Sequence, residues 1–224
     1  MTYDPLQGTD LARATLPESM TGFGIAEIAT IVASQDTPEA TRSREIFGIA
    51  ANYASDDIVL AGSSALTARG LLSSTAGEGH LLSSAALLRT AVSTCVRWTR
   101  IGLLSESTPR VVFVLQSPDV TAIVEPNAVL TWWTAFADPN QDVAALVASL
   151  VEQRLGAQTP AVVVDVRSLD SSVGNVVIAK GANDALIART NVGAEGVGGE
   201  EHHLAPDGLA GLLAAYVPVI STST

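Results

Sequence analysis

The strongest structural constraint in this chain is a period-two alternation of side chains in its middle third, where β-branched residues are common. The runs that carry the pattern extend over residues 97–104, 109–116, 120–125 and 128–136. Ser117, Pro118 and Asp119 separate the second run from the third, and residues of these types form the tight turns that join antiparallel neighbours. We therefore expect an antiparallel meander at the centre of the fold.

Helical patterns lie on both sides of this meander. Thr37, Pro38 and Glu39 provide a cap, a first-turn proline and an acidic residue at the positive end of the helix dipole, so a helix should begin there. The spacing of apolar residues predicts helices over 38–53, 58–72 and 83–96 before the meander, and one over 138–156 after it.

The last third of the chain repeats this order. Strands are predicted over 161–166, 176–180 and 186–190, and a glycine-rich turn over 193–199 precedes a final helix. The start of that helix, residues 204–207, resembles residues 82–85 in placing a leucine just before a polar or proline position. The sequence thus predicts an α+β fold, with a central antiparallel sheet flanked by helices and a pseudo-twofold repeat of two α/β halves.

The predicted organisation has three segments. Residues 1–36 form a loosely ordered lead-in, interrupted by prolines and glycines, with a first strand or helix over 25–32. Residues 37–156 form the first α/β half. Residues 157–224 form the second half, which packs on the same sheet.

The charge balance narrows the classes of partner. The chain has 12 basic and 23 acidic residues, a net charge of −11, which repels phosphate backbones and anionic lipid headgroups. No stretch reaches the roughly 18 apolar residues of a membrane span, and no basic region followed by an apolar run opens the chain. The single cysteine fits a reducing compartment. We therefore expect a cytoplasmic protein that binds neither nucleic acid nor membranes.

Residue types suited to catalysis or metal binding are few. Cys95 falls on the apolar stripe of a predicted helix, where a thiol stays protonated, and no serine stands in a G-x-S-x-G elbow. Residues 200–203, two glutamates and two histidines, have neighbouring side chains that diverge, so we expect a solvated turn there rather than a metal site. Residues 193–199 lack the Lys-Ser/Thr of a phosphate loop. We expect no enzyme activity, no catalytic residue, no metal and no cofactor.

Trp132 and Trp133 stand next to each other on the fourth predicted strand. Successive side chains on a strand point to opposite faces, so one indole should enter the core and the other should face outward. The outward indole is either covered by a second layer of helices or part of a partner-binding patch.

One segment resembles a known family. Residues 64–72, Ser-Ala-Leu-Thr-Ala-Arg-Gly-Leu-Leu, followed by a helix, a run of strands and a further helix, are similar to the first half of the ESX secretion-associated EspG family. The tail over 186–217, with strands, a glycine-rich turn and a closing leucine-rich helix, is similar to the second half. The resemblance covers most of the chain from about Thr37 onward.

The EspG resemblance implies a pseudo-twofold α/β fold with a central antiparallel sheet. It also implies a cytosolic chaperone that binds a secreted helical protein client before a type VII secretion system exports it, without ATP, metal or cofactor. Such a chaperone would contact its client through loops at one end of the sheet. Ser117, Pro118 and Asp119, together with the outward member of the pair Trp132 and Trp133, are therefore the candidate partner-binding residues.

Two other classes stay open. The helices over 38–53, 58–72 and 83–96, followed by two strands, are compatible with a winged-helix transcriptional regulator whose recognition helix lies near residues 84–95, although the charge balance disfavours DNA binding. An enzyme whose site is assembled from residues distant in sequence is the second alternative. The identity of the client and the oligomeric state are left open.

Overall fold

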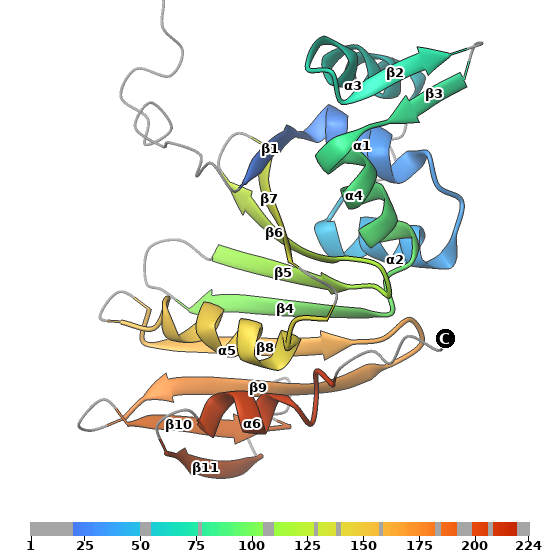
Figure 1. Cartoon of the computed structure of the whole chain (residues 1–224). Helices are drawn as coiled ribbons and strands as arrows, with labels where there is room; N and C mark the ends of the chain where they lie inside the picture. The colour runs from blue at the N-terminus through green and yellow to red at the C-terminus, as the bar shows by residue number, and fades with distance from the viewer. Residues whose placement is uncertain are drawn as a thin grey trace, which may run out of the picture.

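The structure is a computed structural model of the whole chain, and it describes residues 20–49, 55–75, 78–104, 110–127, 130–137, 140–156, 159–181, 185–191, 199–205 and 208–218. Within these residues, a large antiparallel sheet carries helices on both of its faces (Figure 1). The predicted α+β class with a central antiparallel sheet is confirmed.

The sheet contains nine strands within the described ranges, in the spatial order β1, β7, β6, β5, β4, β8, β9, β10, β11. Their bounds are β1 (Thr21–Gly24), β4 (Arg97–Leu104), β5 (Arg110–Gln116), β6 (Thr121–Asn127), β7 (Thr131–Ala137), β8 (Ala161–Arg167), β9 (Ser172–Lys180), β10 (Leu186–Thr190) and β11 (Glu200–Leu204). Every neighbouring pair is antiparallel.

The helices are α1 (Ile25–Ala33), α2 (Pro38–Phe47), α3 (Asp56–Ala68), α4 (Ser83–Ser93), α5 (Val143–Glu152) and α6 (Gly208–Leu213), and a separate hairpin consists of β2 (Leu72–Thr75) and β3 (Glu78–Leu81). The start of α2 lies where its cap residues predict it. Thr37 Oγ1 accepts a hydrogen bond from the amide of Ala40 at 3.1 Å, and Pro38 occupies the first turn.

The order of elements repeats along the chain. Strands β4 to β7 form a four-stranded meander that α5 follows, and strands β8 to β11 form a second such meander that α6 follows. The first strands of the two meanders, β4 and β8, are neighbours in the middle of the sheet, with Ile101 opposite Val164. The predicted boundary between residues 156 and 157 lies between α5 and β8.

Two hydrophobic cores occupy opposite faces of the sheet. On what we call the first face, α1, α2 and α4 cover the first meander, and this core includes Ile28, Phe47, Leu88, Trp98, Phe113 and Trp132. On the second face, α5 and α6 cover β4, β5 and β8 to β10, and this core includes Val147, Val164, Ile178, Ala188 and Leu213. Figure 1 looks onto the second face, with α5 and α6 in front of the strands they cover.

Most elements lie close to their predicted positions. The strands predicted over 97–104 and 186–190 have those bounds, and the segment over 25–32, predicted as strand or helix, lies in α1. The helices predicted over 38–53 and 58–72 end earlier, at Phe47 and Ala68, because Gly48 and Gly70 adopt left-handed backbone with φ of 68° and 67°. Residues 50–53 lie outside the described residues.

Four short strands were not predicted from alternation. Thr21–Gly24 forms the edge strand β1, and residues 73–80, expected as a turn, belong mostly to the hairpin of β2 and β3. The expectation of a solvated turn over 200–203 is wrong, because these residues pair with β10 as β11. Charged side chains are tolerated there since β11 is an edge strand.

Two further expectations reach beyond the described residues. Residues 1–19 of the predicted lead-in and residues 192–198 of the glycine-rich turn lie outside them. Within the described part of the chain, none of the helices combines the length and hydropathy needed to cross a membrane.

Candidate protein-binding face

The structure separates the predicted partner-binding residues into two places. Ser117 is buried in the turn between β5 and β6, where its hydroxyl donates to Val120 O at 2.7 Å, while Asp119 is exposed. Trp132 pairs with Pro126, five residues along β6 from Thr121. At about 3.4 Å per residue, the turn and the tryptophans are therefore about 17 Å apart, at opposite ends of the strand.

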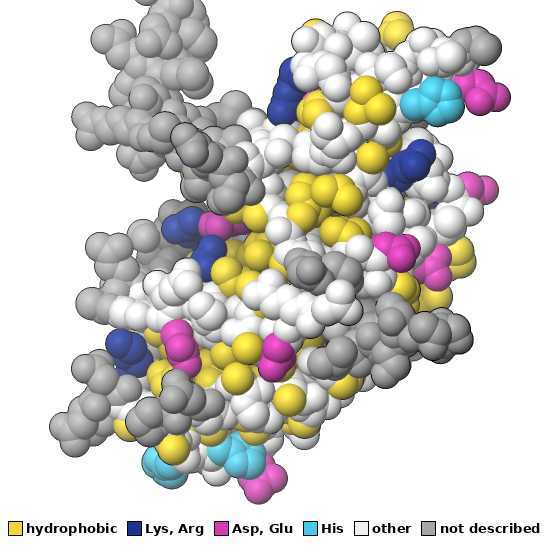
Figure 2. Space-filling model, viewed as in Figure 1, with side chains coloured by type: hydrophobic (Ala, Val, Ile, Leu, Met, Phe, Trp, Pro, Cys, Tyr) yellow, Lys and Arg dark blue, Asp and Glu magenta, His cyan; other side chains and the backbone are white. Residues whose placement is uncertain are grey.

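The two tryptophans point to opposite faces, as the alternation predicts. Trp132 is 6% exposed and belongs to the first-face core, opposite Phe23 of β1. Trp133 is partly exposed on the second face, opposite Glu125. In Figure 2, hydrophobic side chains reach the surface of this face near the middle of the molecule. A partner-binding role for Trp133 stays a prediction.

The carboxylate beside Trp133 is held by two arginines. Glu125 has a side chain that is only 8% exposed, and it forms ion pairs with Arg110 of β5 and with Arg154, just after α5, the latter at 3.0 Å. Since two guanidiniums satisfy one carboxylate, this group is best explained as a structural link between β5, β6 and α5.

The residues considered for chemistry do not assemble into a site. Cys95 is fully buried, its thiol donates to Arg97 O at 3.1 Å, and burial raises the pKa of this thiol far above its ordinary value. Among the described residues, no three side chains of His, Cys, Asp or Glu are grouped so that they could hold a metal ion.

The least explained feature is the first face of the second meander. Here Val163, Val177, Ala179 and Ile187 are partly exposed and Leu104 is 49% exposed, and none of them belongs to either hydrophobic core. We call this surface the open face. Within the described residues, all helices near these strands lie on the other side, because α5 and α6 pack on the second face (Figure 1).

The sequence of β8 and β9 is that of strands covered on both faces. Both strands contain continuous aliphatic runs, residues 162–164 and 176–178, in place of strict alternation. Near-continuous runs of this kind are typical of strands that have a layer packed on each side. Among the described residues, only the second face of β8 and β9 has that layer, whereas α1, α2 and α4 give the first meander its layer on the first face.

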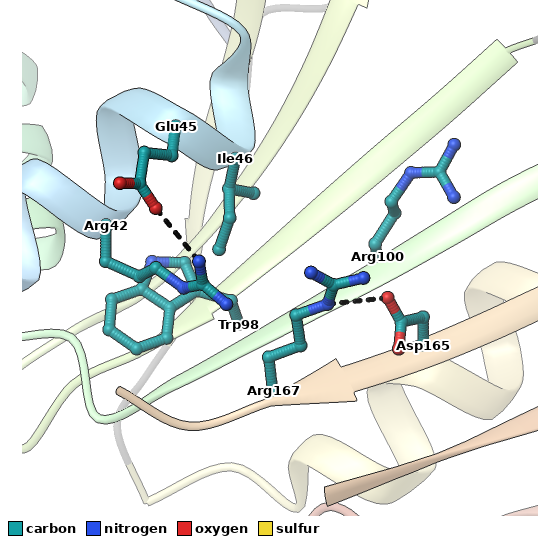
Figure 3. A pocket seen from close by; sticks show the side chains of 7 residues that line it. All are labelled: Arg42, Glu45, Ile46, Trp98, Arg100, Asp165 and Arg167. Atoms are coloured by element: carbon teal, nitrogen blue, oxygen red, sulfur yellow. Dashed lines mark hydrogen bonds and ion pairs between the residues drawn. The ribbon is translucent and has the colours of Figure 1, made fainter. Parts of the chain in front are cut away.

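A cavity of about 320 Å³ lies where α2 ends over the sheet and the open face begins (Figure 3). Its lining consists of Arg42, Glu45 and Ile46 from α2, Trp98 and Arg100 from β4, and Asp165 and Arg167 from β8. Trp98 lies against the first-face core, and its indole Nε1 donates to Ser43 Oγ at 3.0 Å, which fixes the position of the ring.

The charges of this cavity are partly paired. Arg42 Nη1 lies 2.9 Å from Glu45 Oε2, and Arg167 Nε lies 2.8 Å from Asp165 Oδ2. Arg100 has no ion-pair partner among the described residues, although the register places it opposite Asp165. The lining therefore carries one positive charge in excess, within a chain whose net charge is −11.

Sequence reasoning did not find this site. The aliphatic runs of β8 and β9 were the available signal, because they exceed what one covered face requires. The meeting of Arg42 with Arg100 and Arg167 could not be foreseen, since it depends on how α2 crosses the sheet.

Comparison with protein-family models and with curated proteins gives no match for this chain. The class of protein must therefore be argued from the geometry described above.

Proposed function

We propose that this protein is a binding module that holds another protein, and that an amphipathic helix of this client covers the open face. The observation that carries the proposal is the incomplete layering of the sheet: β8 and β9 have aliphatic side chains on both faces and a helical layer on one. Apolar surface that remains in water on central strands favours association, because burying it is worth about 25 cal/mol per Å².

The dimensions of the open face fit one short helix. Leu104, Ala179 and Ile187 lie in one row across neighbouring strands β4, β8, β9 and β10. Three strand spacings of about 4.8 Å make this row about 14 Å long, which equals the length of roughly ten helical residues. Helix α5, which covers the opposite face of the same region, has ten residues.

The charge of the region also suits a protein client. Arg100 is exposed on β4 and its guanidinium lies beside Gly102, next to the row that contains Leu104, so a client helix with an apolar stripe and an acidic flank is complementary to both features. The central antiparallel sheet and the repeated meanders are what the EspG resemblance implies, and they support its more specific form, a cytosolic chaperone for a secreted helical protein of a type VII secretion system.

Co-purification from the native host, followed by mass spectrometry and reconstitution with the purified client, tests this proposal. The tagged wild-type chain should return one dominant small helical protein. Val177→Glu should lose it, because the substitution places a carboxylate in the middle of the open face. Leu60→Glu is the matched control, since Leu60 is 71% exposed on α3, away from that face.

Further variants separate the alternative surfaces. If Trp133→Ala loses the client and Val177→Glu keeps it, the second-face patch is the binding site and the open face is not. If the purified wild type is a dimer that Val177→Glu dissociates, a second copy covers the open face and the client proposal is wrong. Light scattering measures the oligomeric state, and circular dichroism shows whether each variant is folded.

A further inference from the structure

We propose that Arg100 binds a carboxylate, the side chain of an aspartate or glutamate on the protein that covers the open face. This inference rests on the proposed function for the source of the carboxylate. It adds a specific contact and a chemical identity to a surface that is otherwise defined by its apolar residues.

The position of the Arg100 side chain is the first argument. Its register partner across β4 and β8 is Asp165, but the Asp165 carboxylate accepts a hydrogen bond from Arg167 on its own strand. Arg100 instead extends along β4 over Gly102. A Cβ at Gly102 would lie 3.7 Å from Arg100 Nη1 and 3.8 Å from Val163 O, both ordinary contact distances, so the guanidinium lies directly beside the Gly102 backbone.

That placement puts a cation without an ion-pair partner among the described residues at the border of the open face. Gly102 lies between Val111 of β5 and Val163 of β8 in the sheet register. Arg100 is exposed and has no ion-pair partner among the described residues. A client side chain that reaches the cavity from the open face would therefore meet the Arg100 guanidinium, whose planar fork suits a carboxylate in bidentate geometry.

The cavity around it has more donors than acceptors. Arg167 Nε donates to Asp165, and no hydrogen bond from the terminal nitrogens of Arg167 is found within the described residues. Arg42 Nε is buried and has no hydrogen-bond partner in the described part of the chain. Since Glu45 and Asp165 are already engaged by Arg42 and Arg167, an additional carboxylate would be met by donors rather than by free acidic groups.

The binding test uses a blocked glutamate, N-acetyl-glutamic acid N-methylamide, and follows the arginine Nε–H signals of the ¹⁵N-labelled chain by NMR. The Arg100 signal is the one that disappears in Arg100→Gln. We expect the Arg100 signal to shift in a saturable manner. The apparent Kd for blocked glutamate at Arg100 should be at least ten-fold lower than that at Arg89, an arginine of α4 that lines a different cavity. The blocked glutamine analogue should cause no such shift.

Several results would overturn the inference. Equal responses of Arg100 and Arg89 would mean general ion screening, and a tighter response to inorganic phosphate at matched ionic strength would assign the site to phosphate instead. The proposed function fails separately. If blocked glutamate binds at Arg100 while Val177→Glu keeps the client, Arg100 binds carboxylates but the open face is not the client-binding surface. If Val177→Glu loses the client and the Arg100 signal does not shift, the open face binds the client without this contact.

Discussion

The close crossing of α1 and α3 gives a sharp test of the structure. A Cβ added at Gly62 of α3 would lie 2.1 Å from Ala26 O and 2.2 Å from Thr30 Oγ1 of α1. The same Thr30 hydroxyl donates to Ala26 O at 2.8 Å and lies 3.1 Å from Val59 O of α3. The Gly62→Ala substitution must therefore push the two helices apart.

The expected cost follows from three contributions. Overpacking costs about 3 kcal/mol at the upper end of its usual range, which applies because the obstacle is a backbone oxygen. Disrupting the Thr30 hydrogen bonds adds about 1 kcal/mol. Replacing glycine by alanine inside a helix returns about 1 kcal/mol. The net loss is about 3 kcal/mol, which lowers Tm by roughly 6–12 °C in a chain of this size.

The matched control is Gly211→Ala in α6, where a Cβ would meet nothing within 4 Å. The same chemical change should there raise Tm by roughly 2–4 °C, because only the helix propensity changes. Thermal unfolding followed by circular dichroism measures both. If Gly62→Ala is as stable as Gly211→Ala, Gly62 of α3 does not lie in contact with Ala26 and Thr30 of α1.

Three further predictions concern charge and the thiol. Glu125→Gln should lower the free energy of unfolding in urea by about 1–3 kcal/mol, because Arg110 and Arg154 keep only a neutral partner. Glu45→Gln, which removes the exposed ion pair with Arg42, should change this free energy by less than about 0.5 kcal/mol. Burial raises the pKa of Cys95 above its unfolded value of about 8.5, so the native state keeps a proton that the unfolded state loses at alkaline pH. The free energy of unfolding should therefore decline above about pH 9, by up to roughly 1.4 kcal/mol per pH unit more in wild type than in Cys95→Ala. Parallel curves of unfolding free energy against pH for the two proteins would contradict this. Genomic DNA fragments should show no mobility shift at micromolar protein and physiological salt, and a shift would support the regulator alternative.

Local sequence patterns were sufficient to predict the elements whose position depends on residues near them in the sequence. The Thr37 cap with Pro38 gives the start of α2, and the alternation of β4 gives a strand with the predicted bounds. Strands β1 and β11 were not predicted because they are edge strands whose backbone hydrogen bonds are made with β7 and β10. A segment of four or five residues contains no pattern that identifies a strand partner elsewhere in the chain.

The candidate site depends on contacts between elements, and this is why sequence reasoning chose other residues. Trp132 and Trp133 were chosen as large aromatic side chains, and alternation predicted that one of them faces outward without deciding which; the structure places Trp133 outward. The open face required knowledge of which side α5 and α6 cover. Until that is known, the aliphatic runs of β8 and β9 are equally compatible with a fully enclosed sheet.

The composition of one row across the sheet limits what the open face can hold. From β4 to β11 this row reads Gly102, Val163, Val177, Arg189 and Glu201. Arg189 Nη2 and Glu201 Oε2 are 2.7 Å apart, and their hydrogen bond lowers the pKa of the Glu201 carboxyl, so the outer two strands end the apolar surface in a paired, solvated border. On the inner side, Arg100 over Gly102 forms the other border. An occupant bounded by cations and ion pairs at both ends of this row must be short, which favours one amphipathic helix of about ten residues over a broad protein surface.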